Sequence, residues 1–413
     1  MSQPERLCGG NRLALLVGGA ATYESMLAAI ASAQQSIFLV TYILHSDATG
    51  RRFRDALIER ARAGVDVRLM YDAFGSYDTL DDAFLTPLAE AGVAIHIFHP
   101  VIPGRIEAQE RLRKIYDGIQ LRLGRTPPSR SRFAPDLLGF HRRNHQKILA
   151  VDERIAFTGG INIGDDYADR EEHGERVRGW HDLHVRVEGP AAQQLANAFR
   201  IAWNQSGGSH LATTLVPICR PEPVRVEVLA NLGFHGLRER MRGGGSPWMW
   251  NVYRTAIRAA RERIVIANAY FLPDRGIRKA LMEQARRGVR VQVIVPKDSD
   301  VRIVRDASHS YYTELLAAGI EIHEYREGMM HAKATVIDGE WATIGSYNLD
   351  HRSFRHNLEA GLAALDRDFA RSVLEQLDRD IAACEQIDFH AWRHRPWKQR
   401  LREWLARNFV YWL

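Results

Sequence analysis

The chain has 413 residues, 46% of them hydrophobic, with 56 Lys and Arg against 50 Asp and Glu. This length suits about two domains, and the apolar content excludes a disordered chain. The formal charge of +6 suggests an acidic partner, either anionic lipid or nucleic acid. The N-terminus lacks a signal-peptide profile, and no run reaches the roughly 18 apolar residues of a spanning helix. Any membrane contact is therefore expected at the bilayer surface.

The first half of the chain alternates helices with buried strands. We expect a helix over Tyr23–Ala33, a strand over Ser36–Tyr42, a helix over Arg51–Ala63 and a strand over Val65–Met70. Gly64 follows the second helix and can supply the left-handed turn that ends it.

The second half repeats this order. We expect a helix over Tyr253–Ala260, a strand over Ile264–Tyr270, a helix over Ile277–Arg287 that Gly288 ends, and a strand over Val289–Val295. Short β-branched runs between helices of this length predict an α/β fold with a mainly parallel sheet.

The two halves differ by one insertion. From Gly92 to His145 is 53 residues, whereas the matching interval from Gly319 to His331 is 12. The first half therefore contains about 41 extra residues, roughly within Val101–Phe140. They form either a lid or membrane-facing element, or a surface excursion without a role in the site.

A linker and a distinctive tail complete the organisation. Asn204–Pro223, rich in Gly, Ser and Pro, reads as the linker, which gives a first half of residues 1–210 and a second half of 211–389. The tail, 390–413, has four Trp and six Lys or Arg against one acid, with a helix expected over Pro396–Phe409. This composition is typical of an interfacial membrane helix, although a helix packed on the protein body fits as well.

The most informative feature is the pattern H-x-K-x4-D-x6-G-[GS]-x-N, which occurs twice with identical spacing. The first copy consists of His145, Lys147, Asp152, Gly159, Gly160 and Asn162. The second copy consists of His331, Lys333, Asp338, Gly345, Ser346 and Asn348.

The motif provides what is needed to handle a phosphate ester. In a strand, positions i and i+2 share a face, so each His and its Lys can reach one phosphate together. Two histidines allow one to attack while the other exchanges a proton with the leaving group. Lysines can neutralise the phosphate oxygens as the transition state develops.

The other motif residues have expected roles too. Asn162 and Asn348 can donate hydrogen bonds to the same phosphate oxygens. The small residues Gly160 and Ser346 allow a substrate to approach closely. The two motif aspartates complete the catalytic set, but they should fall beside a turn and act mainly in structure or charge balance.

The doubled motif resembles that of the phospholipase D superfamily, and most closely that of short bacterial cardiolipin synthases without spanning helices. The resemblance extends from about Asn11 to Asp388. The stretches that carry it are Arg143–Lys147, Phe157–Ile163, Trp180–Asp182, Ala267–Phe271, Gly345–Ser353 and Asn357–Ala360.

The resemblance implies two pseudo-twofold-related α/β/α halves packed face to face with the active site between them. It also implies a covalent phosphohistidine intermediate without a metal or other cofactor. Asp182 and Glu359 match the family's acidic partners of the catalytic histidines. His145 matches the histidine that acts as nucleophile in many members.

The expected function is cardiolipin synthesis, in which phosphatidyl transfer between two phosphatidylglycerol molecules releases glycerol. Hydrolysis by the same intermediate, a nuclease activity or a non-enzymatic lipid-binding role are the alternatives, and the residues alone do not separate transfer from hydrolysis. We expect phosphatidylglycerol and anionic membrane as partners, no nucleic acid, and a peripheral location on the cytoplasmic face of the membrane. The pairs His141/His145 and His181/His184 have metal-ligand spacing only in a helix, so we expect no metal there.

Overall fold

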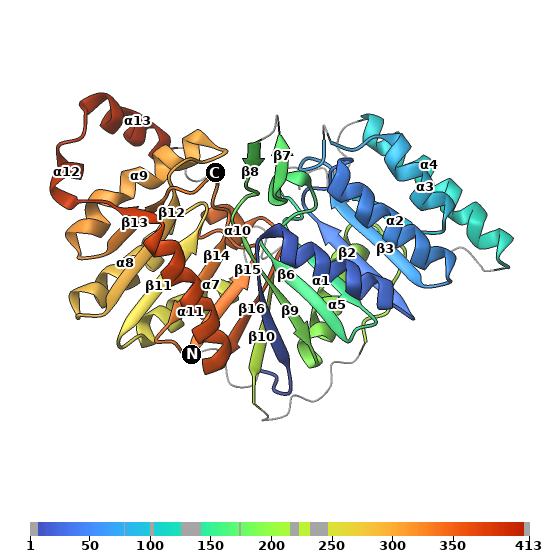
Figure 1. Cartoon of the computed structure of the whole chain (residues 1–413), viewed down its shortest axis with the longest axis horizontal. Helices are drawn as coiled ribbons and strands as arrows, with labels where there is room; N and C mark the ends of the chain where they lie inside the picture. The colour runs from blue at the N-terminus through green and yellow to red at the C-terminus, as the bar shows by residue number, and fades with distance from the viewer. Residues whose placement is uncertain are drawn as a thin grey trace.

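The computed structural model describes residues 7–77, 79–99, 103–124, 142–172, 175–214, 223–231 and 247–408. Within these ranges two large β-sheets lie side by side, one for each half of the chain, with helices around them (Figure 1). The expected α/β fold of two similar halves is confirmed.

The first sheet has seven strands in the order β1-β9-β6-β5-β2-β3-β4. Their bounds are β1 Arg12–Val17, β2 Ser36–Thr41, β3 Asp66–Asp72, β4 Ala94–Phe98, β5 Ile148–Val151, β6 Ile155–Gly159 and β9 Leu183–Glu188. A separate hairpin is formed by β7 (Arg170–Glu172) and β8 (Glu175–Val177).

The second sheet has eight strands in the order β10-β16-β15-β14-β11-β12-β13-β17. Their bounds are β10 Arg225–Asn231, β11 Arg263–Asn268, β12 Arg290–Pro296, β13 Glu321–Tyr325, β14 Lys333–Ile337, β15 Trp341–Gly345, β16 Glu359–Leu365 and β17 Cys384–Gln386.

The prediction of mainly parallel sheets is wrong. Only β2, β3 and β4 in the first sheet and β11, β12 and β13 in the second pair in parallel. The first motif strand, β5, instead forms a hairpin with β6. The tight turn between them contains Asp152 and Glu153, with φ of 51° and 54°. Such turns join antiparallel neighbours, so each sheet is mixed.

Helices cover both faces of each sheet. The first half contains α1 Gly18–Ser32, α2 Ala48–Arg62, α3 Asp82–Glu90, α4 Pro103–Arg122, the 3-10 turn η3 Asp165–Tyr167 and α5 Pro190–Gln205. The second half contains α7 Pro247–Ala259, α8 Arg275–Arg286, α9 Arg302–Ala317, α10 His351–Arg355 and α11 Arg367–Ala382. The tail forms α12 Phe389–Arg393 and α13 Trp397–Arg407.

Alternate residues of each strand face different layers. In β2, Ile37 and Leu39 join the outer core with α1, α2 and α3, whereas Phe38 and Val40 join an inner core. Phe38 stacks on Phe199 of α5 at 5.1 Å between ring centroids. Removing a fully buried ring such as Phe199 typically costs about 3–5 kcal/mol of stability.

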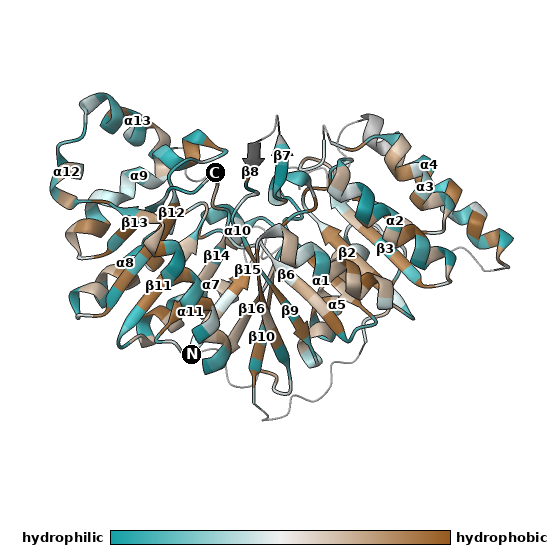
Figure 2. Ribbon diagram, viewed as in Figure 1, coloured by the Kyte–Doolittle hydropathy of each residue, from teal (hydrophilic) through white to brown (hydrophobic). Residues whose placement is uncertain are grey.

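The inner core extends across both halves. It includes residues of α5 and β9 from the first half together with β14, β15, β16 and α11 from the second. The halves therefore share one continuous apolar interior, which fixes their relative position. Figure 2 shows mostly brown strands in both sheets, beside helices that are partly teal.

The insertion begins with α4, which packs against α3 and β4 at the outer side of the first sheet (Figure 1). Its buried residues include Ala108 and Leu112. Residues 125–141, the rest of the insertion before the motif, lie outside the described ranges, as do residues 215–222 of the expected linker. The domain limits at residues 210 and 389 stay our prediction.

In the part of the chain that is described, no helix combines the length and apolarity needed to cross a bilayer.

Candidate active site

The two motif histidines lie at the same edge of their respective sheets. The end of β2 pairs with the start of β5, with Val40 opposite Ile148, and the end of β11 pairs with the start of β14, with Asn268 opposite Lys333. We call this the site edge: the ends of β2, β3, β11 and β12 together with the segments that enter β5 and β14.

Each histidine is anchored by the backbone of the opposite half. The amide of His145 donates to the carbonyl of Leu358 at 2.9 Å, and the amide of His331 donates to the carbonyl of His181 at 2.7 Å. The residue after each of these carbonyls is an acid, Glu359 in one case and Asp182 in the other. The repeat therefore places both motifs at the boundary between halves.

The two carboxylates are exchanged between the halves. Nδ1 of His145 lies 3.0 Å from Oε2 of Glu359, and Nδ1 of His331 lies 2.8 Å from Oδ2 of Asp182. Both acids are fully buried. A carboxylate at Nδ1 holds the imidazole proton on that nitrogen and leaves the Nε2 lone pair for chemistry.

Burial controls the charge of these pairs. It lowers the pKa of His145 well below its usual value, and the nearby charges of Lys147 and Lys333 lower it further. Burial and Lys333 also lower the pKa of His331, and the hydrogen bond that its Nδ1–H donates to Asp182 opposes this lowering. Burial raises the pKa of Glu359 to about 7. His145 is consequently neutral near pH 7, the state that a nucleophile requires.

The motif lysines are buried beside their histidines. Lys147 Nζ donates to the carbonyl of His145 at 2.9 Å, and Lys333 makes the same bond to the carbonyl of His331. Burial lowers the pKa of Lys147 to about 7 and that of Lys333 to about 8. An anion bound between them would restore their charge, because an opposite charge favours the protonated amine.

The small motif residues make room for the carboxylates. A Cβ at Gly160 would lie 2.2 Å from Oδ1 of Asp182, so any larger residue would displace that acid. Ser346, at the matching position, donates its hydroxyl to Glu359. The space that we expected these small residues to leave for a substrate is thus occupied by Asp182 and Glu359.

The motif asparagine of the first half has hydrogen-bond partners within the protein. The side-chain oxygen of Asn162 accepts from the Ile43 amide at 3.2 Å, and its NH2 group donates to the Tyr167 hydroxyl at 2.9 Å. Asn162 therefore holds Tyr167, whose hydroxyl lies 3.2 Å from Nδ1 of His331. Donation from Asn162 to a phosphate oxygen stays a prediction. Asn348 is buried in the matching place.

The motif aspartates lie at the far end of the strands. Asp152 accepts hydrogen bonds from the amides of Gln34, Gln35 and Ser36, all at 2.8 Å. Asp152 lies seven residues after His145, and a strand of that length spans about 23 Å. The structure thus does not bring this acid to the histidines.

Asp338 repeats the arrangement in the second half, where it accepts from three amides at 2.9 Å. The donors are Arg261, Glu262 and Arg263. The position of the two motif aspartates does not support placing them among the catalytic residues. It fits the structural role beside a turn that we also expected.

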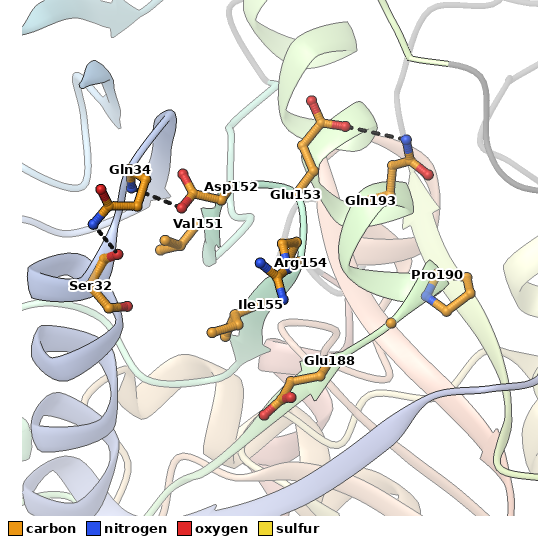
Figure 3. Close-up of a pocket in the computed structure, with 11 residues that line it drawn as sticks. Ser32, Gln34, Val151, Asp152, Glu153, Arg154, Ile155, Glu188, Pro190 and Gln193 are labelled. Atoms are coloured by element: carbon orange, nitrogen blue, oxygen red, sulfur yellow. Dashed lines mark hydrogen bonds between the residues drawn. The ribbon is translucent and has the colours of Figure 1, made fainter. Parts of the chain in front are cut away.

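A pocket of about 620 Å³ surrounds the turn at Asp152 in the first half (Figure 3). It is lined by Asp152, Glu153, Arg154 and neighbouring residues of α1, β9 and α5. Because it lies at the end of the sheet away from His145, the pocket is separate from the site edge.

Aromatic rings around the histidines were not identified from the sequence. The Tyr42 ring lies 4.9 Å from that of His145, and the rings of Tyr167, Trp180 and Tyr270 lie 5.7–6.3 Å from that of His331. Tyr42 and Tyr270 come one and two residues after the buried strands β2 and β11, which is the one signal that could have indicated them. These rings exclude water and restrict how each imidazole turns.

His181 and His184 pack within the protein. His184 is fully buried beneath Gly159. His181 lies 3.0 Å from Asp380 and stacks on Tyr325. Among the described residues, no cluster of three or more His, Cys, Asp or Glu side chains could hold a metal ion.

Comparison with known proteins agrees with this geometry. The family model described as "Cardiolipin synthase, PLD-like domain" matches residues 26–203 and 253–381, one match for each half. The chain belongs to the cardiolipin synthase family of the phospholipase D superfamily. The matched ranges include all residues of the doubled motif.

Relatives in the cardiolipin synthase family match nearly the whole chain. It is 32% identical over 401 residues to the cardiolipin synthase of Geobacillus kaustophilus, which covers 96% of this chain and 71% of that protein. It is 33% identical over 378 residues to cardiolipin synthase A of Pseudomonas fluorescens, covering 91% and 70% respectively.

Among solved structures, the phosphatidylserine synthase of Haemophilus influenzae matches with a TM-score of 0.63 over 99% of this chain and 93% of that one. The sequence identity is 15%, so this likeness supports the fold alone.

Proposed function

We propose that the protein is a cardiolipin synthase that transfers a phosphatidyl group from one phosphatidylglycerol molecule to another. The observation that carries this proposal is the reciprocal pairing of His145 with Glu359 and of His331 with Asp182. It provides two oriented imidazoles with buried cations beside them, as phosphodiester transfer requires. Relatives named as cardiolipin synthases over most of the chain supply the substrate class.

The first step forms the covalent intermediate. Nε2 of His145 attacks the phosphorus of phosphatidylglycerol, and the bond from phosphorus to the glycerol oxygen breaks. Protonated His331 donates its proton to that oxygen, so neutral glycerol leaves. Lys147 and Lys333 balance the charge on the non-bridging oxygens.

The second step reverses the roles of the groups. A second phosphatidylglycerol places its free hydroxyl where glycerol left, and His331, now neutral, takes the hydroxyl proton. The oxygen attacks phosphorus, the bond to His145 breaks, and cardiolipin is released with both histidines restored.

The order of roles rests on an asymmetry of charge. The third and fourth residues after Asn348 are His351 and Arg352, and the Arg352 charge lowers the pKa of His145. The same positions after Asn162 are acidic, Asp165 and Asp166. Burial and Lys333 lower the pKa of His331 as well, but the hydrogen bond to Asp182 and the charges of Asp182 and Asp300 oppose this lowering. A neutral His145 suits attack, and a more readily protonated His331 suits proton donation.

A product assay tests this function. Purified protein is incubated with headgroup-labelled and acyl-labelled phosphatidylglycerol in vesicles containing EDTA, and the lipids are separated by thin-layer chromatography. We expect one glycerol released for each cardiolipin formed. Phosphatidic acid as the main product would assign the protein to hydrolysis instead, and activity on a nucleic-acid diester alone would reject the lipid substrate.

Membrane contact through the C-terminal tail is part of the proposal. Helix α13 packs against α9 through a buried side that includes Glu403 and Ala406, while Trp397 and Trp404 are 67% and 61% exposed. Exposed Trp beside Lys and Arg is typical of helices that lie in the headgroup layer. The tail thus both packs on the body and offers an apolar outer face.

The proposed location is the cytoplasmic face of the membrane, where the protein binds peripherally. No nucleic-acid partner and no cofactor are included in the proposal.

A further inference from the structure

Large apolar side chains that are strongly exposed gather in a few places. Eight of the eleven such residues in the described chain lie on α13 or in two short segments at the site edge. The segment after β3 exposes Phe74 and Tyr77, by 61% and 49%. The segment after β12, which extends into the first turn of α9, exposes Val301 and Ile303, by 36% and 40%. We call these two segments the edge loops.

The edge loops occupy matching places in the two halves. β3 runs parallel to β2, and β12 runs parallel to β11. The loops after β3 and β12 therefore leave their sheets at the end where His145 and His331 lie. An equivalent loop with exposed apolar residues on each side of the site is not expected from core packing.

Each edge loop is tied to an aromatic residue that contacts a catalytic histidine. In the first half, the Ser76 hydroxyl donates to the Tyr42 carbonyl at 3.2 Å, and the Tyr42 ring lies against His145. In the second half, the Tyr270 hydroxyl donates to Asp300 at 2.6 Å, and the Tyr270 ring lies against His331.

Charge on α13 fits a negatively charged surface. Lys398, Arg400 and Arg402 are exposed along this helix, whereas its one acid, Glu403, is buried and pairs with Arg395 at 2.6 Å. The second edge loop also carries acids, so the positive charge comes mainly from α13.

We propose that the two edge loops insert, together with the outer face of α13, into the interfacial layer of an anionic phospholipid bilayer. This proposal rests on the proposed lipid substrate. It adds the orientation of the protein: the site edge faces the membrane, and the two apolar loops enter it on either side of the histidines. A phosphatidylglycerol headgroup then reaches His145 while its acyl chains stay in the bilayer. Exposed apolar residues beside cationic ones favour such a surface.

The test compares two matched pairs of substitutions in the full chain. The edge-loop variant carries Tyr77→Ser with Ile303→Ser. The control variant carries Leu121→Ser with Leu123→Ser, which are 63% and 61% exposed at the far end of α4. None of the four residues takes part in the proposed chemistry.

Binding is measured by co-sedimentation with phosphatidylglycerol vesicles, and turnover is measured on vesicles and on short-chain phosphatidylglycerol below its micellar concentration. We expect the edge-loop variant to bind vesicles about 10-fold more weakly and to lose vesicle turnover in proportion, because two apolar insertions are lost. The control should bind as the unchanged protein does. Both variants should keep their short-chain turnover.

Unchanged vesicle binding of the edge-loop variant, or an equal loss in the control, overturns the proposal. Faster sedimentation of the unchanged protein than of the edge-loop variant would show that a second copy of the chain covers the loops. This result would also overturn the proposal. Absence of turnover on both substrates in the unchanged protein overturns the proposed function instead, and the vesicle-binding comparison still decides the orientation. If the double variant does not fold, Tyr77→Ser alone is compared with Leu123→Ser.

Discussion

Oε2 of Glu359 lies 3.0 Å from Nδ1 of His145, although the two residues belong to different halves of the chain. The reciprocal contact joins Asp182 of the first half to His331 of the second at 2.8 Å. Each half thus contributes the histidine of one pair and the acid of the other.

Replacing either acid with its amide should impair catalysis with little effect on folding. In Glu359→Gln or Asp182→Asn, the amide can donate to Nδ1 and so favour the wrong tautomer of the histidine. By analogy with such pairs in other enzymes, kcat should fall by about 10³-fold. Asp380→Asn, which changes the acid beside His181, is the control and should keep most activity. Turnover within tenfold of the unchanged protein in both amide variants would contradict this role.

The intermediate should be trapped in only one of the two histidine variants. His331→Ala should accumulate phosphatidyl label on the protein slowly, because His145 can attack but release lacks a base. His145→Ala should remain unlabelled, and both variants should lose at least about 10³-fold in turnover. Acid-gel analysis after incubation with acyl-labelled phosphatidylglycerol measures the label. Label on His145→Ala alone would reverse the assigned roles.

Anion binding should weaken as pH rises. Burial lowers the pKa of Lys147 to about 7 and that of Lys333 to about 8, so above these values the unoccupied site loses positive charge. Sulfate keeps its charge across this range and can report the change. Its inhibition constant should rise by about tenfold per pH unit as each lysine loses its proton. Lys147→Gln should show a weaker dependence; an inhibition constant independent of pH from 6.5 to 9 contradicts the argument.

Removing the distal aspartates should affect stability and leave chemistry largely intact. Asp152→Ala and Asp338→Ala each leave three backbone amides without their charged acceptor. We expect a loss of about 2 kcal/mol in the free energy of unfolding for each. Urea unfolding measures this loss, and kcat at 20 °C should stay within about threefold. A large fall in kcat in a folded variant would return these acids to the catalytic set.

The outer face of α13 should be needed for membrane binding and not for folding. Trp397→Ser with Trp404→Ser should weaken vesicle binding by about tenfold or more while preserving the melting temperature. Deleting 396–413 should reduce both vesicle binding and the melting temperature, since α13 also packs on α9. Raising the salt concentration should weaken binding of the unchanged protein, because its basic residues contribute about 1 kcal/mol each near an anionic surface. Equal vesicle binding by the double variant rejects the contact.

Much of the fold could be predicted because the repeat was visible in local patterns. The expected strand over Ser36–Tyr42 is β2, and the helix expected to end before Gly288 is α8, within a few residues at each end. The orientation of the strands was missed, because a run such as Ile148–Val151 has the same apolar pattern whether its neighbour is parallel or antiparallel. The tight turn at Asp152 decides the orientation, and this turn has positive φ without glycine.

The sequence predicted which residues form the site better than it predicted which of them pair with one another. Spacing identified the histidines and lysines, and the family resemblance added both acids. Which acid serves which histidine depends on packing between residues more than 140 positions apart, which no local pattern encodes. The hydrogen bond from Asn162 to Tyr167 was not predicted either, although these residues are five positions apart, because it follows no helix or strand periodicity.

The exchange of acids between the halves makes reactivity depend on assembly. A newly made first half would contain His145 without Glu359, and hence a freely rotating imidazole with no fixed tautomer. The second half would bring His331 without Asp182. Neither half could then cleave membrane lipid while the chain is incomplete or its halves are apart. The order of the two acids along the chain thus couples the reactivity of both histidines to the completed fold.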